Sequence, residues 1–298
     1  MAISTSSAGN VVTGYLGKHI GTLKTLDPMV RSGEPDAVHQ MRVAARRLRS
    51  TLQSFGKPVF ASDTTAVTAE LKWLGTVLGA ARDAEVLGAH IRSSLEQLPP
   101  ELVVGPVMAR VQGHFAAAGA AARSAAQAAL DSERYLALLD QLDALVSAPQ
   151  PTTATAGPAG DVLRAPVRRA YRRTDRRMRA ALRTPPGRPR ELALHEARKA
   201  AKRARYAAEA VAPAAGSQAG RFARQMKKLQ TVLGDHQDSV IARQVERELG
   251  MSAHLAGENA FSYGLIYERD AVAGERLAQE AAGVWRRASR KRYRRWLG

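Results

Sequence analysis

Apolar residues recur at helical spacing along almost the whole sequence, and this periodicity constrains the fold more than any other feature. Alanine, leucine and arginine dominate, and aromatic residues make up only 5% of the 298 residues. Alternation of β-branched and aromatic residues, which is typical of strands, is hard to find. The pattern therefore predicts an all-α protein. We expect its helices to be interrupted by turn signals at Asp27-Pro28, 32–36, 56–58, Pro99-Pro100, 184–190 and Pro213.

Positive charge is concentrated in the second half of the chain. The formal net charge is +18, with 14 Lys and Arg against 13 Asp and Glu in residues 1–150, and 31 against 14 in residues 151–298. This balance indicates a polyanionic partner: nucleic acid, an acidic membrane surface or a phosphate polymer. The absence of cysteine excludes disulfides and thiolate metal sites and favours a cytoplasmic setting. No apolar stretch is long enough to predict a membrane-spanning helix.

A charge-free segment, SAPQPTTATAGPAG, divides the chain near its midpoint and has the Pro, Thr and Gly content of a linker. Three residue pairs align across it at a spacing of 156: Tyr15 with Tyr171, Leu26 with Leu182, and His39 with His195. TVLGAARD (76–83) likewise matches TVLGDHQD (231–238). We interpret this as an internal duplication within one domain, 1–298. Repeats 9–147 and 161–298 are then joined by a linker, 148–160, and packed about a pseudo-twofold axis.

The helix expected after an N-cap at Asp36 carries a stripe of basic residues. At 100° per residue the stripe covers an arc of about 80° beside the apolar face, and Arg47 lies off it. Its members are His39, Arg42, Arg46 and Arg49. The second half repeats this stripe with His195, Arg198, Lys202 and Arg205.

Two stripes of like charge indicate a bound polyanion. Like charges at this spacing disfavour a helix by about 0.2–0.5 kcal/mol each, and an anionic ligand would offset that cost. A linear chain fits a stripe of about 15 Å better than one small anion does. We expect a nearby phosphate to raise the pKa of the two histidines. Metal binding by these histidines is disfavoured because their neighbours are cations, so we expect no metal and no cofactor.

A second pair of segments adds to the stripes. Lys72 and Lys227 hold matching places in ELKWLGTVLG and QMKKLQTVLG, and Arg82 follows in the first copy. We interpret the Leu-Gly dipeptides that end these segments as hairpins, with Asp83 and Asp238 at the start of the next helix. The two aspartates are expected to be N-terminal caps or orienting partners for the basic groups.

At these motifs the sequence resembles the CHAD family, the conserved histidine α-helical domain. The resemblance rests on VHQMRVAARRLRSTLQSF, LGAARDAEVL, LHEARKAAKRARYAAE and MKKLQTVLGDHQDSV, and extends from about residue 10 to the C-terminus. It implies two four-helix bundles with a basic central groove that binds inorganic polyphosphate, and association with polyphosphate-rich bodies in cells. The stripe residues match the family's basic motif, with Lys72 and Lys227 behind them. The E-x-E-x-K motif of a phosphohydrolase domain fused to some relatives is absent from the sequence.

Two other functions stay open at this point. Net charge permits nucleic-acid binding, although the sequence has no zinc-finger or RNA-recognition signature and few aromatic residues for base stacking. A phosphohydrolase usually needs carboxylates that hold Mg²⁺ or a glycine-rich phosphate loop, and only Asp83 and Asp238 are candidates. We therefore expect non-enzymatic polyphosphate binding, with nucleic acid as a weaker competitor.

Overall fold

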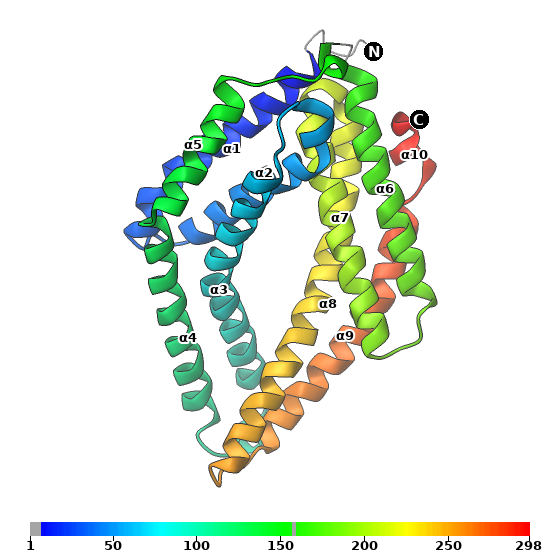
Figure 1. Ribbon diagram of the computed structural model, residues 1–298. Helices are drawn as coiled ribbons and strands as arrows, with labels where there is room; N and C mark the ends of the chain where they lie inside the picture. The colour runs from blue at the N-terminus through cyan, green and yellow to red at the C-terminus, as the bar shows by residue number, and fades with distance from the viewer. Residues whose placement is uncertain (1–6, 157–158) are drawn as a thin grey trace.

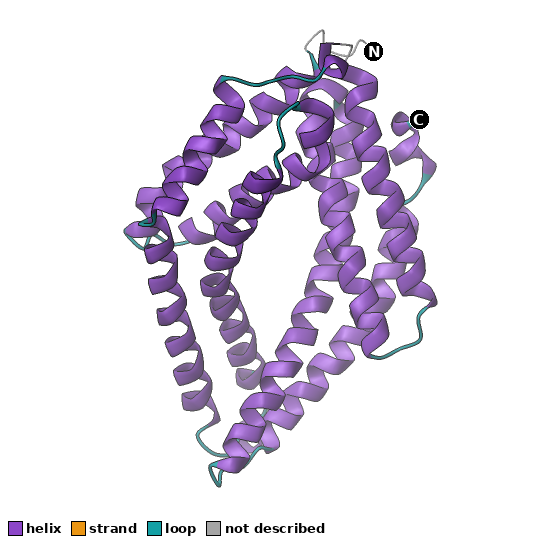
Figure 2. Ribbon diagram, viewed as in Figure 1, coloured by secondary structure: helices purple, strands orange, loops and turns teal. Residues whose placement is uncertain are grey.

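The computed structural model describes residues 7–156 and 159–298, and within them the chain forms helices and no strand (Figures 1 and 2). The all-α prediction is thereby confirmed. None of the described helices has the length and apolar character needed to cross a membrane. The α-helices are α1 (Ala8–Arg31), α2 (Ala37–Val59), α3 (Thr65–Glu96), α4 (Val107–Leu130), α5 (Glu133–Ser147), α6 (Ala159–Arg183), α7 (Arg188–Ala215), α8 (Ser217–Leu255), α9 (Phe261–Ala288) and α10 (Lys291–Arg294). Three short 3₁₀ helices accompany them: Pro100–Leu102, Thr153–Ala156 and Arg295–Leu297.

Helix α2 shows how the apolar spacing forms the core. Met41, Ala45, Leu48, Leu52 and Phe55 recur every three or four residues, and each is buried. Residues three or four apart lie on the same side of a helix, so these side chains form one continuous apolar face. The charged residues between them lie to the side of this face, which separates the core from the surface that carries the basic stripe.

Helices that follow each other in sequence pack against each other in both halves. The pairs α1–α2, α2–α3 and α3–α4 are in contact in the first half, as are α6–α7, α7–α8 and α8–α9 in the second. Helix α5 returns along α1. Each half is therefore an up-and-down arrangement with the same helix order. The internal duplication itself stays an interpretation of the sequence.

The two halves meet at two junctions. At the first, α2 packs against α7, and the main apolar core is continuous through both halves, with Leu16 and Leu48 in the same cluster as Leu194 and Phe222. At the second, the far ends of α3 and α4 meet α8 and α9 around a smaller apolar cluster. Figure 1 shows α3 and α8 converging towards this second junction. We call these contacts the α2–α7 junction and the α3–α8–α9 junction.

The segment between α5 and α6 is held against the end of α2. The Ala61 N–H donates to the Gln150 carbonyl at 2.8 Å, and the Thr152 N–H donates to the Val59 carbonyl at 3.1 Å. Of the predicted linker, residues 157–158 lie outside the described residues. The described part of this segment therefore contributes contacts of its own to the first half.

Several helix ends differ from the sequence-based expectation. Pro28, Pro58 and Pro213 were expected to break helices, but they lie in the last turns of α1, α2 and α7. A proline so near the end of a helix disturbs few remaining hydrogen bonds, so the helix continues past it. Asp36 does occupy the N-cap position of α2, but its φ is 63° and its side chain makes no cap. Its Oδ2 accepts from Gln40 Nε2 at 3.4 Å instead.

The expected Leu-Gly hairpins are absent from the described chain, because α3 and α8 run through Gly79 and Gly234 without a break. Asp83 and Asp238 consequently lie inside helices, and the prediction that they cap new ones is wrong. Each glycine has helical backbone geometry and a side chain from the preceding helix packed against it. These glycines serve close packing rather than a turn.

Candidate functional site

The α2–α7 junction brings five cations together. Arg42, Arg46 and Arg49 come from α2, and Arg198 and Lys202 from α7. Burial first, and then the charges of the four arginines, lower the pKa of Lys202 to about 7. We call these five residues the cation cluster. Their mutual effect on Lys202, together with the packing of α2 against α7, brings these members of the two predicted stripes near one another.

Arg46 lies at the centre of the cation cluster. Burial lowers its pKa, and the charges of Arg42 and Arg198 lower it further, while the Tyr206 hydroxyl opposes the shift through a hydrogen bond. The Arg46 Nε is buried and has no hydrogen-bond acceptor among the described residues. Arg46 therefore holds a positive charge that is largely withdrawn from water and incompletely matched by the protein.

Arg42 and Arg198 are placed by equivalent glycines. A Cβ on Gly79 would lie 3.3 Å from Nε and Nη2 of Arg42, and one on Gly234 would lie 3.5 Å from Nε of Arg198. The guanidinium groups thus rest on helix backbone that carries no side chain. Arg42 also donates to Asp83 through Nη1 at 2.8 Å and Nη2 at 3.4 Å. This pair agrees with the interpretation of Asp83 as an orienting partner.

The two predicted histidines flank the cation cluster in different surroundings. Burial lowers the pKa of His39, as do the charges of Arg82, Arg46 and Arg42, while Asp36 raises it. His39 Nδ1 is buried without a hydrogen-bond partner in the described chain. His195 Nδ1 lies 2.6 Å from Oε1 of Gln237, the residue that matches Arg82 in the sequence alignment of the halves.

A cleft of about 710 Å³ adjoins His195 on α7, α8 and α9, and basic groups contribute to its lining. Arg243 and Arg247 belong to that lining. Arg82 in the first half forms an ion pair with Glu85 at 2.8 Å, so it is partly neutralised. The charge around His195 is therefore arranged differently from the charge around His39.

Arg205, the last member of the second stripe, is ion-paired rather than free. Its Nε donates to Glu209 Oε1 at 2.6 Å, and its Nη1 donates to Gln230 Oε1 at 3.3 Å. Arg47 Nε lies 3.5 Å from the other oxygen of Glu209. Glu209 thus neutralises part of the charge of both arginines. The structure separates Arg205 from the cation cluster, and it places Arg47 in an ion pair between α2 and α7.

Lys72 and Lys227 are exposed on α3 and α8. Each lies seven residues before a packing glycine, Gly79 or Gly234, and seven residues are close to two helical turns. Each lysine consequently lies on the helix face that receives an arginine from the neighbouring helix. Both lysines flank the cation cluster rather than belong to it.

Two residues near the cluster escaped the sequence analysis. Tyr206 is buried and hydrogen-bonds Arg46, and Arg203 donates from Nη2 to Gln53 Oε1 of α2 at 3.2 Å. Burial lowers the pKa of Arg203, helped by the charges of Arg173 and Arg49. The available signal was weak: a hydroxyl-bearing ring among the alanines of the apolar face, and a basic residue next to Lys202.

This arrangement can bind anions. Five positive groups are held near one another, and their guanidinium forks suit phosphate oxygens. The one group of metal-ligating side chains in the described residues lies elsewhere and does not include His39 or His195. The chemistry at the α2–α7 junction is therefore that of fixed positive charge.

Comparisons with known proteins agree with this fold. A model of the CHAD domain family matches residues 14–246. The uncharacterized proteins MT2285 of Mycobacterium tuberculosis (strain CDC 1551 / Oshkosh) and Rv2226 of Mycobacterium tuberculosis (strain ATCC 25618 / H37Rv) are each 38% identical over 277 residues, which cover 91% of this chain and 52% of theirs. The chain thus spans about half the length of the curated relatives it matches.

Two solved structures are similar. PptA from Streptomyces chartreusis superposes with a TM-score of 0.77 at 21% identity, over 95% of this chain and 99% of that one, and supports the fold alone. The CHAD domain from the plant Ricinus communis gives a TM-score of 0.74 at 28% identity, over 94% and 92% of the two chains. The fold, the family match and the duplicated stripes together show that this chain belongs to the CHAD domain family.

Proposed function

We propose that the protein binds inorganic polyphosphate along a basic groove at the α2–α7 junction and catalyses no reaction on it. One observation carries the proposal: Lys202 lies among four arginines from two helices, and its pKa is lowered to about 7. Such a shift means that the charged ammonium is unfavourable in the protein alone. A polyanion in contact with it would remove that cost.

A linear polyanion suits the placement of these groups better than a single phosphate does. Arg42 and Arg49 are seven residues apart on α2, so they extend over about 10 Å of helix. Lys72 and Lys227 continue the positive charge on either side, and His39 and His195 stand at the ends of the two stripes. A repeating chain of phosphates can contact these groups one after another.

Titration calorimetry with long-chain polyphosphate at two salt concentrations tests the proposal. We expect tight binding at low salt that weakens steeply as salt rises, because neutralising many charges releases many counterions. Arg123→Ala is the matched control, since it removes an exposed positive charge from α4, away from the junction. Arg46→Ala should weaken binding about tenfold or more, and Arg123→Ala by less than about twofold. No binding by the unmodified protein at low salt would overturn the proposal.

A nucleic-acid function is separated from this one by competition. Few aromatic residues are available to stack bases, so duplex or single-stranded DNA should displace polyphosphate poorly. DNA that binds as tightly as polyphosphate, at equal phosphate concentration, would favour the nucleic-acid function instead.

The absence of catalysis and the location in the cell are tested separately. Polyphosphate incubated with the protein and Mg²⁺ should release no phosphate; release that Asp83→Ala abolishes would reveal a phosphohydrolase. We further propose that the protein is cytoplasmic and associates with polyphosphate granules. A fluorescent fusion should overlap with the granules, and the same fusion carrying Arg46→Ala and Lys202→Ala should not.

A further inference from the structure

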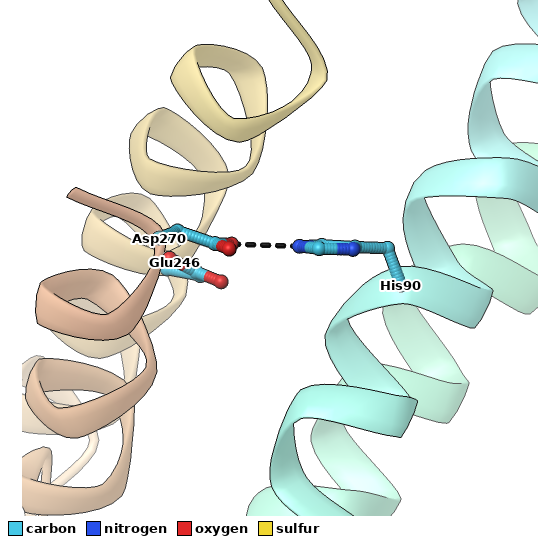
Figure 3. Close-up of side chains that lie close together, drawn as sticks. All are labelled: His90, Glu246 and Asp270. Atoms are coloured by element: carbon cyan, nitrogen blue, oxygen red, sulfur yellow. Dashed lines mark hydrogen bonds and ion pairs between the residues drawn. The ribbon is translucent and has the colours of Figure 1, made fainter. Parts of the chain in front are cut away.

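Three metal-ligating side chains converge at the α3–α8–α9 junction. His90 comes from α3, Glu246 from α8 and Asp270 from α9, and Figure 3 shows them pointing towards one another. One potential ligand atom from each lies within 4.8 Å of the others. His90 Nε2 and Asp270 Oδ2 are 2.7 Å apart, at hydrogen-bonding distance. The three residues bring together helices from both halves of the chain.

Glu246 is the least satisfied member of this group. Its relative exposure is 0%, and neither carboxylate oxygen has a hydrogen-bond donor among the described residues. Burial first, and then the charge of Asp270 and a hydrogen bond with it, raise the pKa of Glu246 to about 8, although Arg243 opposes the shift. Buried carboxylates are costly unless they are paired or coordinate a metal ion. Asp270 is also buried, so a second carboxylate shares the same apolar surroundings.

Glu246 lies on the buried apolar face of α8, where an ionisable side chain is costly. Ala242, Leu249 and Ala253 precede and follow it on the same face of α8, and all three are buried. The smaller apolar cluster of the molecule lies beside them. An apolar residue at position 246 would continue this face, so a carboxylate there needs a reason beyond packing.

The donor set is one that divalent transition metals accept. An imidazole nitrogen and two carboxylate oxygens bind Zn²⁺ or Mn²⁺ at about 2.0–2.2 Å, which separates tetrahedral ligand atoms by about 3.4 Å. The three potential ligand atoms lie within 4.8 Å of one another, so small side-chain rotations can bring all three to bonding distance from one ion. The unpartnered oxygens of Glu246 and the partly exposed ring of His90 leave coordination positions available.

We propose that His90, Glu246 and Asp270 form a binding site for one divalent transition metal ion, Zn²⁺ or Mn²⁺. The ion would join α3 of the first half to α8 and α9 of the second. His90 is eleven residues from Gly79, and Glu246 is twelve from Gly234, so the site is about 16–18 Å along these helices from the packed arginines. It is distinct from the proposed polyphosphate groove and does not depend on it.

Metal binding at this site must displace protons. The proton shared by His90 and Asp270 and the proton held by Glu246 would pass to the buffer as the ion takes their place. Asp270 and Asp238 favour protonated His90, and Arg269 opposes it; Arg243 favours ionised Glu246. Metal affinity should therefore rise with pH, because the ion competes with protons for the same ligand atoms.

Titration of metal-depleted protein with Zn²⁺, Mn²⁺ and Mg²⁺ tests the site, together with thermal unfolding at saturating metal. We expect one Zn²⁺ or Mn²⁺ per chain, weaker binding of Mg²⁺, and a rise in Tm of about 5 °C. Glu246→Gln keeps the size of the side chain and should weaken binding at least tenfold, since even residues behind the ligands contribute that much. His254→Ala, which changes an exposed histidine near the end of α8, should leave binding unchanged.

Unfolding of the variants without metal distinguishes loss of the metal site from loss of the fold. Glu246→Gln should unfold no earlier than the unmodified protein without metal, because it replaces a buried ionisable side chain by a neutral one of the same size. Asp270→Asn provides a second variant with the same expected loss of metal binding. No saturable binding by the unmodified protein, or equal binding by folded Glu246→Gln, would overturn the proposal and leave the polyphosphate proposal untouched.

Discussion

The two junctions between the halves are built from opposite charges. At the α2–α7 junction five cations face one another, and the apolar core continues beneath them. At the α3–α8–α9 junction a histidine and two carboxylates lie beside a small apolar cluster. Each junction places ionisable groups where water is scarce. The cation cluster would be relieved by an anion and the carboxylates by a cation.

Near the α2–α7 junction, some basic side chains are paired with carboxylates and others are not. Arg205 and Arg47 are neutralised by Glu209, and Arg42 by Asp83. Lys202 forms no ion pair among the described residues, although acidic side chains are available elsewhere on the same helices. A partly buried charge without a counter-charge costs stability, and this cost supports the proposal of an anionic ligand.

The largest expected effect is a loss of polyphosphate affinity at the α2–α7 junction without any change in metal binding at the α3–α8–α9 junction. The double variant Arg46→Ala and Lys202→Ala should lower polyphosphate affinity about a hundredfold, since each lost charged contact contributes about tenfold. Its metal affinity should stay unchanged. Calorimetry with both ligands measures this, with Arg123→Ala as the control for net charge. Loss of both activities together would mean that the junctions are not independent.

The two junctions should respond to pH in opposite directions. Below pH 7 Lys202 is already protonated, so its contribution to polyphosphate affinity should be constant there. Above pH 7 binding must take up a proton, and affinity should fall by up to about tenfold per pH unit. Metal affinity should rise over the same range, because the ion must displace protons from its ligands. Titrations between pH 6 and pH 9 with each ligand check both slopes, and slopes of the same sign would contradict this picture.

A smaller effect compares the two packing glycines. Gly234→Ala places its Cβ at an ordinary 3.5 Å from Arg198, so the helix should gain about 0.5–1 kcal/mol of stability. Gly79→Ala places it 3.3 Å from Arg42, which Asp83 also holds, so part of that gain should be lost. Thermal unfolding measures the difference. Equal stabilisation by the two substitutions would show that Arg42 is not constrained by its glycine.

The smallest effect concerns Arg47. Arg47→Ala removes an ion pair with Glu209 and should cost only about 0.2–1 kcal/mol of stability. Polyphosphate affinity should change by less than about twofold, because Arg47 lies off the stripe. Calorimetry alongside Arg46→Ala provides the comparison. An effect as large as that of Arg46→Ala would contradict the assignment of the stripe.

The all-α fold could be predicted because apolar spacing is a local property of the chain. The same reasoning misplaced the Leu-Gly hairpins, because a glycine that ends a helix and a glycine that admits a neighbouring side chain have the same sequence signature. Only the position of Arg42 against Gly79, and of Arg198 against Gly234, separates the two cases. That contact joins different helices and cannot be obtained from the periodicity of either one.

Most of the cation cluster could be predicted from helical wheels, since Arg42, Arg46, Arg198 and Lys202 share one arc on each helix. The surroundings of Arg205 could not be predicted from a helical wheel, because its contacts with Glu209 and Gln230 depend on how α7 packs against α8. The group of His90, Glu246 and Asp270 joins α3 of the first half to the consecutive helices α8 and α9 of the second. Its one local signal was a carboxylate inside an apolar face at Glu246.

The unbroken course of α3 and α8 places one acidic residue beyond each of the packed arginines. Asp83 and Asp238 lie four residues past Gly79 and Gly234. Both aspartates therefore lie about 6 Å further along their helices, on the side of the α3–α8–α9 junction. Burial first, and then the charges of Asp235 and Asp83, raise the pKa of Asp238, while Arg198 opposes the shift. We expect a polyphosphate chain that binds as proposed to extend less readily in that direction, although Asp83 is already paired with Arg42. The opposite ends of α3 and α8 would then be the preferred side for the rest of the polymer.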